Sequence, residues 1–280
     1  MSTLSKINTI LNSIKQLQPL PTSVTRILRA TDDPNVNSSF IAELIGLDQA
    51  LSAKVLQMAN SVSLGYGPYC STLSEAVMRI GFQRIRTIVL GIGASGQLNQ
   101  SLQGYRLGAG QLWTHAVATS TAAQWVSRTL HYPDPEEAYV AGLLHDIGKL
   151  LLDQFILLDY PQIMYSIRIQ KMMLCEAEEQ LIGINHAKVG SLMAEKWNFP
   201  PTLTEAIYCH HTPSLAFDKP KLAAIINIAN AFAAGDSYQM DPNGAVVHPE
   251  SLEILNLDTK KIDQMQREME NYFKISPGIQ

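Results

Sequence analysis

The residues best suited to chemistry are His145 and Asp146, which are adjacent in the apolar segment GLLHDIGKLLL. An imidazole and a carboxylate placed among apolar side chains are costly to bury unless a partner compensates them. A divalent metal ion shared with further His or Asp side chains is a common partner of this kind. The pair therefore predicts a metal-type site and directs attention to the other histidines.

The chain has seven histidines, and five of them fall inside or at the edge of segments expected to be helical. These five are His115, His145, His186, His210 and His211. The other two, His131 and His248, fall in loops and are expected to be solvated. A single histidine on an apolar helix is most often a hydrogen-bonded core residue. We interpret the five together, with Asp146, as candidate metal ligands.

Lys149 completes the candidate site. We expect one helix from about Glu137 to Phe155, on which Asp146 and Lys149 are three residues apart and His145 and Lys149 four. Such spacings place the three side chains on neighbouring sides of one turn. A divalent ion held there acidifies a bound water and offsets charge on a phosphoryl group, and a lysine can hold a phosphate oxygen. The predicted chemistry is phosphate-ester hydrolysis, with Asp146 and Lys149 as the candidate catalytic residues.

The composition is that of a globular protein. The chain has 280 residues, of which 46% are hydrophobic, so it can bury the core of one large domain or two smaller ones. Its 21 Lys and Arg residues against 25 Asp and Glu give a net charge of -4, and no segment gathers enough positive charge for a nucleic-acid footprint. We therefore expect no nucleic-acid partner.

Cysteine usage and the character of the N-terminus indicate a cytoplasmic protein. The three cysteines, Cys70, Cys175 and Cys209, show no paired spacing, which favours reduced thiols that act as small buried hydrophobes. The N-terminal segment MSTLSKINTILNSIKQ is helical in character rather than a signal peptide. No apolar run approaches the roughly 18 residues that span a bilayer. A soluble, cytoplasmic protein without a membrane partner is expected.

Apolar residues recur at helical spacing along most of the chain, and alternating strand patterns are scarce. Polar segments with Pro or Gly, such as TDDPNVNSS at 31–39 and YPDPEE at 132–137, separate the helical stretches. The pattern predicts an all-α protein made of short helices. A polar, glycine-rich segment at 95–110 indicates a boundary between a helical subdomain at 1–100 and a second one at 101–280, which holds the candidate site.

The segment GIGASG, Gly91 to Gly96, formally matches G-x-G-x-x-G and follows the apolar run TIVL. A dinucleotide fingerprint also requires a surrounding βαβ unit and an acidic residue about 20 positions later. The sequence after GIGASG has a helical pattern instead. We therefore do not interpret this segment as a nucleotide-binding loop.

His115, the pair His145-Asp146 in HDIGK, His186 in NHAKVGSLMAEKW and the pair His210-His211 resemble the ordered pattern of the HD phosphohydrolase superfamily. The segments LPTSVTRIL at 20–28, IAELIGLDQALSAKVLQMANS at 41–61 and STLSEAVMRIGFQRIRTIVL at 71–90 are similar to the HDOD family, the HD-related output domains. The resemblance covers roughly residues 15–235 and implies an N-terminal helical bundle packed on an HD-like helical bundle. It also implies a role in bacterial signalling, in a family where many members lack the metal ligands and catalysis is not demonstrated.

Two positions depart from the active members of the superfamily. Those members place a metal-binding Asp on a late helix, where this chain has Asn230. The cyclic-di-nucleotide phosphodiesterases of the HD-GYP type place an acidic ligand where this chain has Gln111, and their GYP loop after the histidine pair is missing. Asp236, six residues after Asn230, could approach the site instead. Because an amide binds divalent metals weakly, we expect one ion or none.

Two functions and one structural alternative follow. The first is a signalling output or interaction module of the HDOD type, with a partly retained HD metal site and a signalling protein as its partner. The second is a metal-dependent phosphohydrolase that acts on a nucleotide or another phosphate-containing small molecule, with Mn, Fe, Ni, Zn or Mg as cofactor. The third is a hydrogen-bonded polar core made by the histidines. The missing carboxylate favours the first function.

Overall fold

The computed structural model describes residues 2–17, 20–31, 33–60, 69–234 and 246–275. In these ranges the regular elements are helices and one isolated antiparallel bridge, between Leu102 and Leu107. The predicted all-α fold is therefore confirmed. No helix in the same ranges is both long enough and apolar enough to pass through a bilayer.

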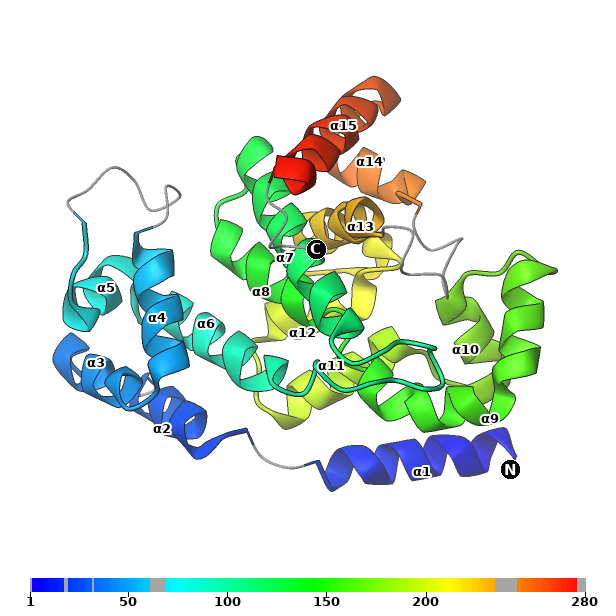
Figure 1. The fold of residues 1–280 in the computed structure, drawn as a ribbon, viewed down its shortest axis with the longest axis horizontal. Coiled ribbons are helices and arrows are strands. Elements are labelled where there is room, and N and C mark those ends of the chain that lie inside the picture. Colours follow the sequence, from blue (N-terminus) through cyan, green and yellow to red (C-terminus); the bar gives the residue numbers. More distant parts are fainter. Residues whose placement is uncertain (1, 18–19, 32, 61–68, 235–245, 276–280) are drawn as a thin grey trace. The chain divides into compact units, whose positions relative to one another are not determined.

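The chain forms two units, a smaller one of residues 18–96 and a larger one of residues 1–17 and 97–280. The helices of the smaller unit are α2 (Thr22–Thr31), α3 (Ser38–Gly46), α4 (Gln49–Ala59), α5 (Leu73–Ile80) and α6 (Phe82–Ser95) (Figure 1). Those of the larger unit are α1 (Thr3–Lys15), α7 (Gln111–Thr129), α8 (Pro135–Leu144), α9 (Lys149–Arg168), α10 (Leu174–Ile182), α11 (His186–Lys196), α12 (Pro201–Cys209), the 3-10 turn η2 (Pro213–Leu215), α13 (Pro220–Ala233), α14 (Pro249–Leu255) and α15 (Thr259–Ile275).

The first helix belongs to the larger unit, which differs from the predicted division at residue 100. Helix α1 contacts α9, α10 and α11, and the Lys6 ammonium group pairs with Asp159 of α9. Lys6 also donates a hydrogen bond of 3.1 Å to the Leu181 carbonyl at the end of α10. These long-range polar contacts attach α1 to helices that follow it by more than a hundred residues, and no local sequence pattern reports them.

The smaller unit holds its helices with polar caps and an aliphatic core. The Asn37 side chain caps α3, and the Asp48 side chain caps α4. Ile27, Ile41 and Ile85 are fully buried between the helices. The segment GIGASG continues α6 as far as Ser95, so the helical interpretation of this stretch holds and no nucleotide-binding loop forms there.

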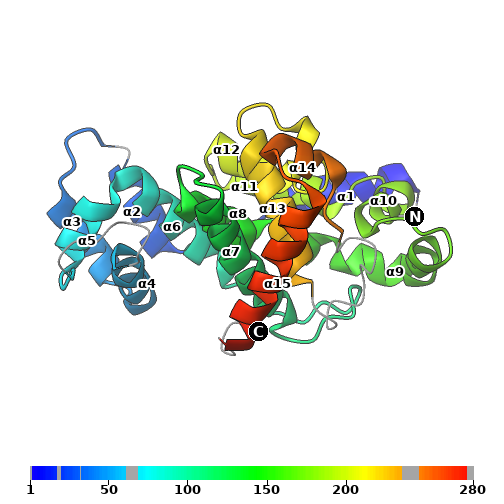
Figure 2. The ribbon, with the colours of Figure 1, turned by 90° about the horizontal axis from the view of Figure 1, so that it is seen from above.

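The centre of the larger unit is formed by α7, α8 and α13, which pack on one another, while α14 and α15 follow α13 and contact it (Figure 2). Small residues on α7 allow α8 to approach closely. A Cβ atom added at Gly142 of α8 would lie 2.8 Å from the Ser120 Cα atom. The close approach places α8, which ends at Leu144, directly against α7, which carries His115.

The single helix expected from Glu137 to Phe155 is wrong, because the chain turns between Leu144 and Lys149 and forms two helices, α8 and α9. The turn is possible because Gly148 lies directly against the backbone of α11. A Cβ atom at this position would be 2.0 Å from the His186 carbonyl oxygen and 2.5 Å from the Gly190 nitrogen. The apolar periodicity continues through the turn, since both helices are buried, and so it gave no sign of the break.

Candidate metal centre

Helix ends deliver most of the candidate ligands. His145 lies at the C-terminal end of α8 and is followed in the turn by Asp146. His186 is the first residue of α11, placed by the Asn185 side chain, which accepts a hydrogen bond of 2.9 Å from the Lys188 backbone. The C-terminal end of α12 carries the remaining histidine pair, and α7 carries the first histidine within its length.

The carboxylate of Asp146 lies at the centre of the cluster. Its Oδ2 atom is 2.6 Å from Lys149 Nζ, 3.4 Å from His145 Nε2 and 3.6 Å from His115 Nε2. Its Oδ1 atom is 3.3 Å from His186 Nε2. The structure therefore brings these sequence-predicted residues together around one carboxylate.

His210 and His211 complete the cluster. The ring of His210 lies 5.0 Å from that of His145 and 4.0 Å from that of His211, centroid to centroid. His211 Nε2 is 2.9 Å from His186 Nε2. The ligand atoms form two groups, each lying within 4.8 Å of one another: His115, His145 and Asp146 in one, and His186, His210 and His211 in the other. All six residues and Lys149 are buried.

Backbone carbonyl groups fix the orientation of two rings. His145 Nδ1 lies 2.8 Å from the Gly142 carbonyl oxygen, and His210 Nδ1 lies 2.7 Å from that of Ile207. A carbonyl oxygen only accepts, so each Nδ1 carries a proton, and in the neutral form of the ring each Nε2 presents a lone pair to the cluster. Neither Nε2 atom has a hydrogen-bond partner among the described residues. Two buried lone pairs thus face the interior of the cluster.

Glu178 orients the third ring. Its Oε2 atom lies 2.7 Å from His186 Nδ1 and accepts a hydrogen bond of 2.7 Å from the His186 backbone nitrogen. The Tyr105 hydroxyl donates to Oε1 at 2.8 Å, and Glu178 is fully buried. A carboxylate that holds one ring nitrogen of a histidine while the other faces a site is the usual support of a metal-binding imidazole.

Burial lowers the pKa of three of the histidines, which are therefore neutral at pH 7. It lowers the pKa of His115 to about 3, although the nearby Asp146 carboxylate acts in the opposite direction. Burial, together with the neighbouring imidazoles, lowers the pKa of His210 and of His211 well below the usual value of 6.5. Burial acts to raise the pKa of Asp146, but His145 and Lys149 outweigh it and hold that pKa well below 3.8. The neutral imidazoles of His115, His210 and His211 and the ionised carboxylate of Asp146 are in the protonation states that metal binding requires.

Asn230 and Gln111, the two positions where the sequence departs from the pattern it resembles, differ in their relation to the cluster. Asn230 is on α13, and its side chain interacts with His115, so the amide does reach the cluster. The Gln111 side-chain oxygen accepts a hydrogen bond of 2.5 Å from the Gly108 backbone at the start of α7. Asp236, the alternative acidic residue, lies outside the described residues.

The two remaining histidines do not join the cluster. His131 is exposed after α7, as expected. His248 is half-buried at the start of α14, where its side chain caps the helix and its backbone nitrogen donates to Asn227 Oδ1 at 2.9 Å. The three cysteines are free and buried, in line with the expectation of reduced thiols.

Sequence reasoning missed Glu178 and Tyr105. One signal for the former was present, because Leu174, Glu178 and Ile182 are spaced by four residues on α10 and all three are buried. A glutamate on the apolar face of a helix needs a partner inside the protein. Tyr105 gave no comparable signal, since it lies in the polar segment between the predicted subdomains.

The comparisons with known proteins agree with this fold. Residues 17–213 match the family model of the HDOD domain. A protein of Treponema pallidum (strain Nichols) with the name "Uncharacterized protein" is 28% identical over 248 residues, which are 83% of this chain and 46% of that protein. The chain thus spans about half the length of this curated relative.

Three crystal structures are similar to this chain. An HDOD domain protein of unknown function from Geobacter sulfurreducens has a TM-score of 0.66 at 21% identity, covering 99% of this chain and 98% of that one. A "Putative phosphohydrolase" from Shewanella amazonensis SB2B has a TM-score of 0.64 at 23% identity, covering 94% and 93%. A "Putative signal transduction protein" from Marinobacter aquaeolei VT8 has a TM-score of 0.64 at 20% identity, covering 99% and 66%.

At these identities the structural likeness establishes the fold, and the family model establishes the relationship. The match extends over both units, from the helices of residues 18–96 to the histidine pair that closes α12. This chain belongs to the HDOD family.

Proposed function

We propose that this protein holds a divalent metal ion in the cluster and hydrolyses a phosphate ester there. The observation that carries the proposal is the pair of buried Nε2 atoms of His145 and His210, which have no hydrogen-bond partner among the described residues. Both face a cluster that contains an ionised carboxylate, Asp146. Buried polar atoms without partners are rare in native proteins and indicate a missing ligand or a functional role.

The residues present fit a divalent ion of intermediate hardness. Five imidazoles and one carboxylate favour Zn, Fe, Ni or Mn over Mg, because Mg prefers a shell of oxygen atoms. Asp146 would hold the ion together with His115 and His145, or together with His186, since its two oxygen atoms face these two sides. The Asn230 amide adds little affinity in either case, so we expect weaker binding than in relatives with a carboxylate there.

When bound, a divalent ion supplies an acidified water and offsets charge on the phosphoryl group. The residues of the chain have separate tasks. Glu178 and the carbonyl oxygens of Gly142 and Ile207 keep three imidazoles in the orientation that presents Nε2. Lys149, now 2.6 Å from Asp146, is the cation available to hold a phosphate oxygen as a point charge.

Phosphate release from a generic ester such as p-nitrophenyl phosphate tests the proposal, with added manganese, iron, nickel or zinc and with a chelator as reference. We expect metal-dependent turnover in the wild type and its loss in His145→Ala and His210→Ala. His131→Asn changes an exposed histidine outside the cluster and serves as the matched control, which should keep full activity. Turnover that is independent of metal, or equal in all four proteins, would contradict the proposal.

We propose as a second function that residues 18–96 bind a signalling protein. Neither of the two metal-type groups found in the described residues includes a residue of this unit, although the HDOD match extends over it. Phe40, Leu47 and Met78 are large apolar side chains of this unit that are 47%, 68% and 63% exposed.

A partner screen with the full chain, followed by mapping with Leu47→Lys and Met78→Lys, tests this second function. Binding that is lost in these variants and kept in His145→Ala would support an interaction module independent of the cluster. Binding that instead depends on the histidines would refute it.

A further inference from the structure

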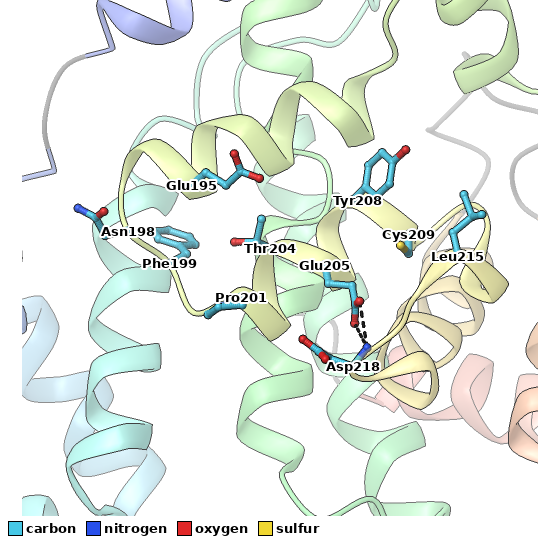
Figure 3. A pocket seen from close by; sticks show the side chains of 10 residues that line it. All are labelled: Glu195, Asn198, Phe199, Pro201, Thr204, Glu205, Tyr208, Cys209, Leu215 and Asp218. Atoms are coloured by element: carbon cyan, nitrogen blue, oxygen red, sulfur yellow. Dashed lines mark hydrogen bonds between the residues drawn. The ribbon is translucent and has the colours of Figure 1, made fainter.

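A groove runs along α12 of the larger unit and ends at the cluster. It consists of two adjoining cavities, an outer one of about 580 Å³ and an inner one of about 410 Å³. Tyr208 and Leu215 line both cavities, and we call the two cavities together the α12 groove. Figure 3 shows the outer cavity, with Asn198 and Phe199 at one end, Thr204 in the middle, and Tyr208 and Leu215 at the other end.

The inner cavity reaches a candidate metal ligand. His211 lines its wall, although the residue is only 8% exposed. The Nε2 atom of the same ring lies 2.9 Å from His186 Nε2, inside the cluster. A molecule in the groove would therefore meet the cluster at His211.

Carboxylates line the groove, and none of its described lining residues is a Lys or an Arg. Glu176 and Glu179 lie on the inner cavity, and Glu195, Glu205 and Asp218 on the outer one. The hydrogen-bond donors to Glu176, Glu179 and Glu205 are neutral groups. Glu176 accepts from the Met173 backbone and Glu179 from the Asn185 amide, both at 2.8 Å. Neutral donors leave the negative charge in place, so the groove attracts cations and repels anions.

Glu205 illustrates how firmly the charge is fixed. Its carboxylate accepts hydrogen bonds from the backbone nitrogens of Phe217, Asp218 and Lys219 at 2.7 to 3.0 Å. Burial acts to raise the pKa of Glu205, but these donors outweigh it and lower the pKa. The ammonium group of Lys188 lies 4.6 Å from the centre of the Tyr208 ring. The arrangement shows that this aromatic face accepts a positive charge.

The outer cavity also has apolar walls and an unused hydroxyl group. Phe199, Tyr208 and Leu215 supply the apolar surface. Thr204 is 9% exposed, and its Oγ1 atom has no hydrogen-bond partner among the described residues. In Figure 3 this hydroxyl is directed towards Phe199, across the cavity. The groove thus combines carboxylates, aromatic rings and one free polar atom, which is the composition of a site for an organic cation.

We propose that the α12 groove binds the alcohol part of the substrate and selects a phosphate ester whose alcohol carries an ammonium group. The inference rests on the proposed function, because the phosphate is placed at the cluster beyond His211. There a water oxygen bonds to phosphorus, the bond from phosphorus to the ester oxygen breaks, and the alcohol leaves with a proton. In a zwitterionic ester the phosphate is complementary to the metal-loaded cluster and the ammonium group to the carboxylates of the groove. The additional phosphates of a nucleoside polyphosphate would be repelled by the same carboxylates.

Two esters of equal shape separate charge from size. Phosphocholine and 3,3-dimethylbutyl phosphate differ only in the quaternary nitrogen, which is a carbon atom in the second compound. With metal-loaded wild type, we expect kcat/KM for phosphocholine to exceed that for 3,3-dimethylbutyl phosphate by about tenfold or more. A tenfold ratio corresponds to about 1.4 kcal/mol of differential interaction. In Glu176→Gln/Glu179→Gln the ratio should fall towards one. Glu268→Gln, an exposed change on α15, should leave it unchanged.

Calorimetry with choline and with its uncharged analogue 3,3-dimethylbutanol keeps this test separate from that of hydrolysis. Choline binding to the metal-free wild type that is weakened at least tenfold in Glu176→Gln/Glu179→Gln would support the groove proposal. If choline binds in this way and neither ester is hydrolysed, only the proposed phosphohydrolase function is overturned. Hydrolysis of both esters with equal kcat/KM would overturn the groove proposal and leave the phosphohydrolase standing. Absence of choline binding would overturn the groove proposal as well.

Discussion

Replacement of Asp146 by Ala should destabilise the metal-free protein by about 3–5 kcal/mol, the usual cost of removing one partner of a buried ion pair. Lys149 Nζ lies 2.6 Å from the carboxylate, and the two side chains are only 4% and 3% exposed. Without the carboxylate, the ammonium group is left buried without its counter-charge.

The assay is urea unfolding at pH 7 in the presence of a chelator, with four variants beside the wild type. Asp146→Ala removes the carboxylate, Lys149→Met removes the ammonium group, and the double variant removes both. The double variant should be clearly more stable than Asp146→Ala, because an uncharged pair leaves no buried charge behind. Asp263→Ala, at an exposed position of α15, is the matched control and should change the free energy of unfolding by less than about 0.5 kcal/mol.

Two results would refute this reasoning. One is a cost below about 1 kcal/mol for Asp146→Ala, which would mean that the ammonium group finds water or another partner. The other is a double variant no more stable than the single one, which would assign the loss to packing rather than to charge. Added metal should stabilise the wild type and not Asp146→Ala, since ligand binding to the native state raises its stability.

Three further predictions concern the same cluster. Below pH 6.5 the metal-free protein should lose stability, because His115, His210 and His211 have a lowered pKa in the folded state and take up protons only on unfolding. The slope of the unfolding free energy approaches about 4 kcal/mol per pH unit for three protons. A free energy of unfolding that stays constant from pH 7 to 5.5 would contradict this prediction. Gly148→Ala should lower the free energy of unfolding, measured in urea, by more than about 3 kcal/mol, because the added Cβ would lie 2.0 Å from a backbone oxygen. Gly96→Ala is the control and should leave the free energy of unfolding nearly unchanged, because nothing lies within 4 Å of the added atom. Glu178→Gln should weaken metal affinity about 10- to 100-fold in competition with a chelating dye, because the support of one imidazole is lost; equal affinity would show that the carboxylate is not needed.

The sequence carried enough information for the fold class and for the cluster residues, because both depend on local patterns. Helical periodicity survives burial, and the ordered series of histidines around Asp146 marks residues that are costly to bury alone. The structure places His115, His145 and His186 beside the Asp146 carboxylate, and it places His210 and His211 against these histidines. Their role as ligands stays a prediction until metal binding is measured.

What escaped prediction depends on contacts between distant segments. The break between α8 and α9 follows from the close approach of Gly148 to the backbone of α11, about forty residues later. The support of His186 by Glu178 and Tyr105 joins three separate segments through hydrogen bonds of 2.7 to 2.8 Å. The attachment of α1 to the larger unit likewise rests on a pair between Lys6 and Asp159. A single sequence has no pattern that reports such long-range pairs.

The central claim is that the cluster binds a divalent metal ion, and the most direct test is the metal content of the chain. The protein is purified without chelator, incubated with manganese, iron, nickel or zinc, desalted, and analysed by mass spectrometry of the elements. We predict at least one ion per chain in the wild type and in His131→Asn, and less than a tenth of that in His145→Ala/His210→Ala. A wild type that retains no metal under any of these conditions, or a double variant that retains as much as the wild type, would contradict the account.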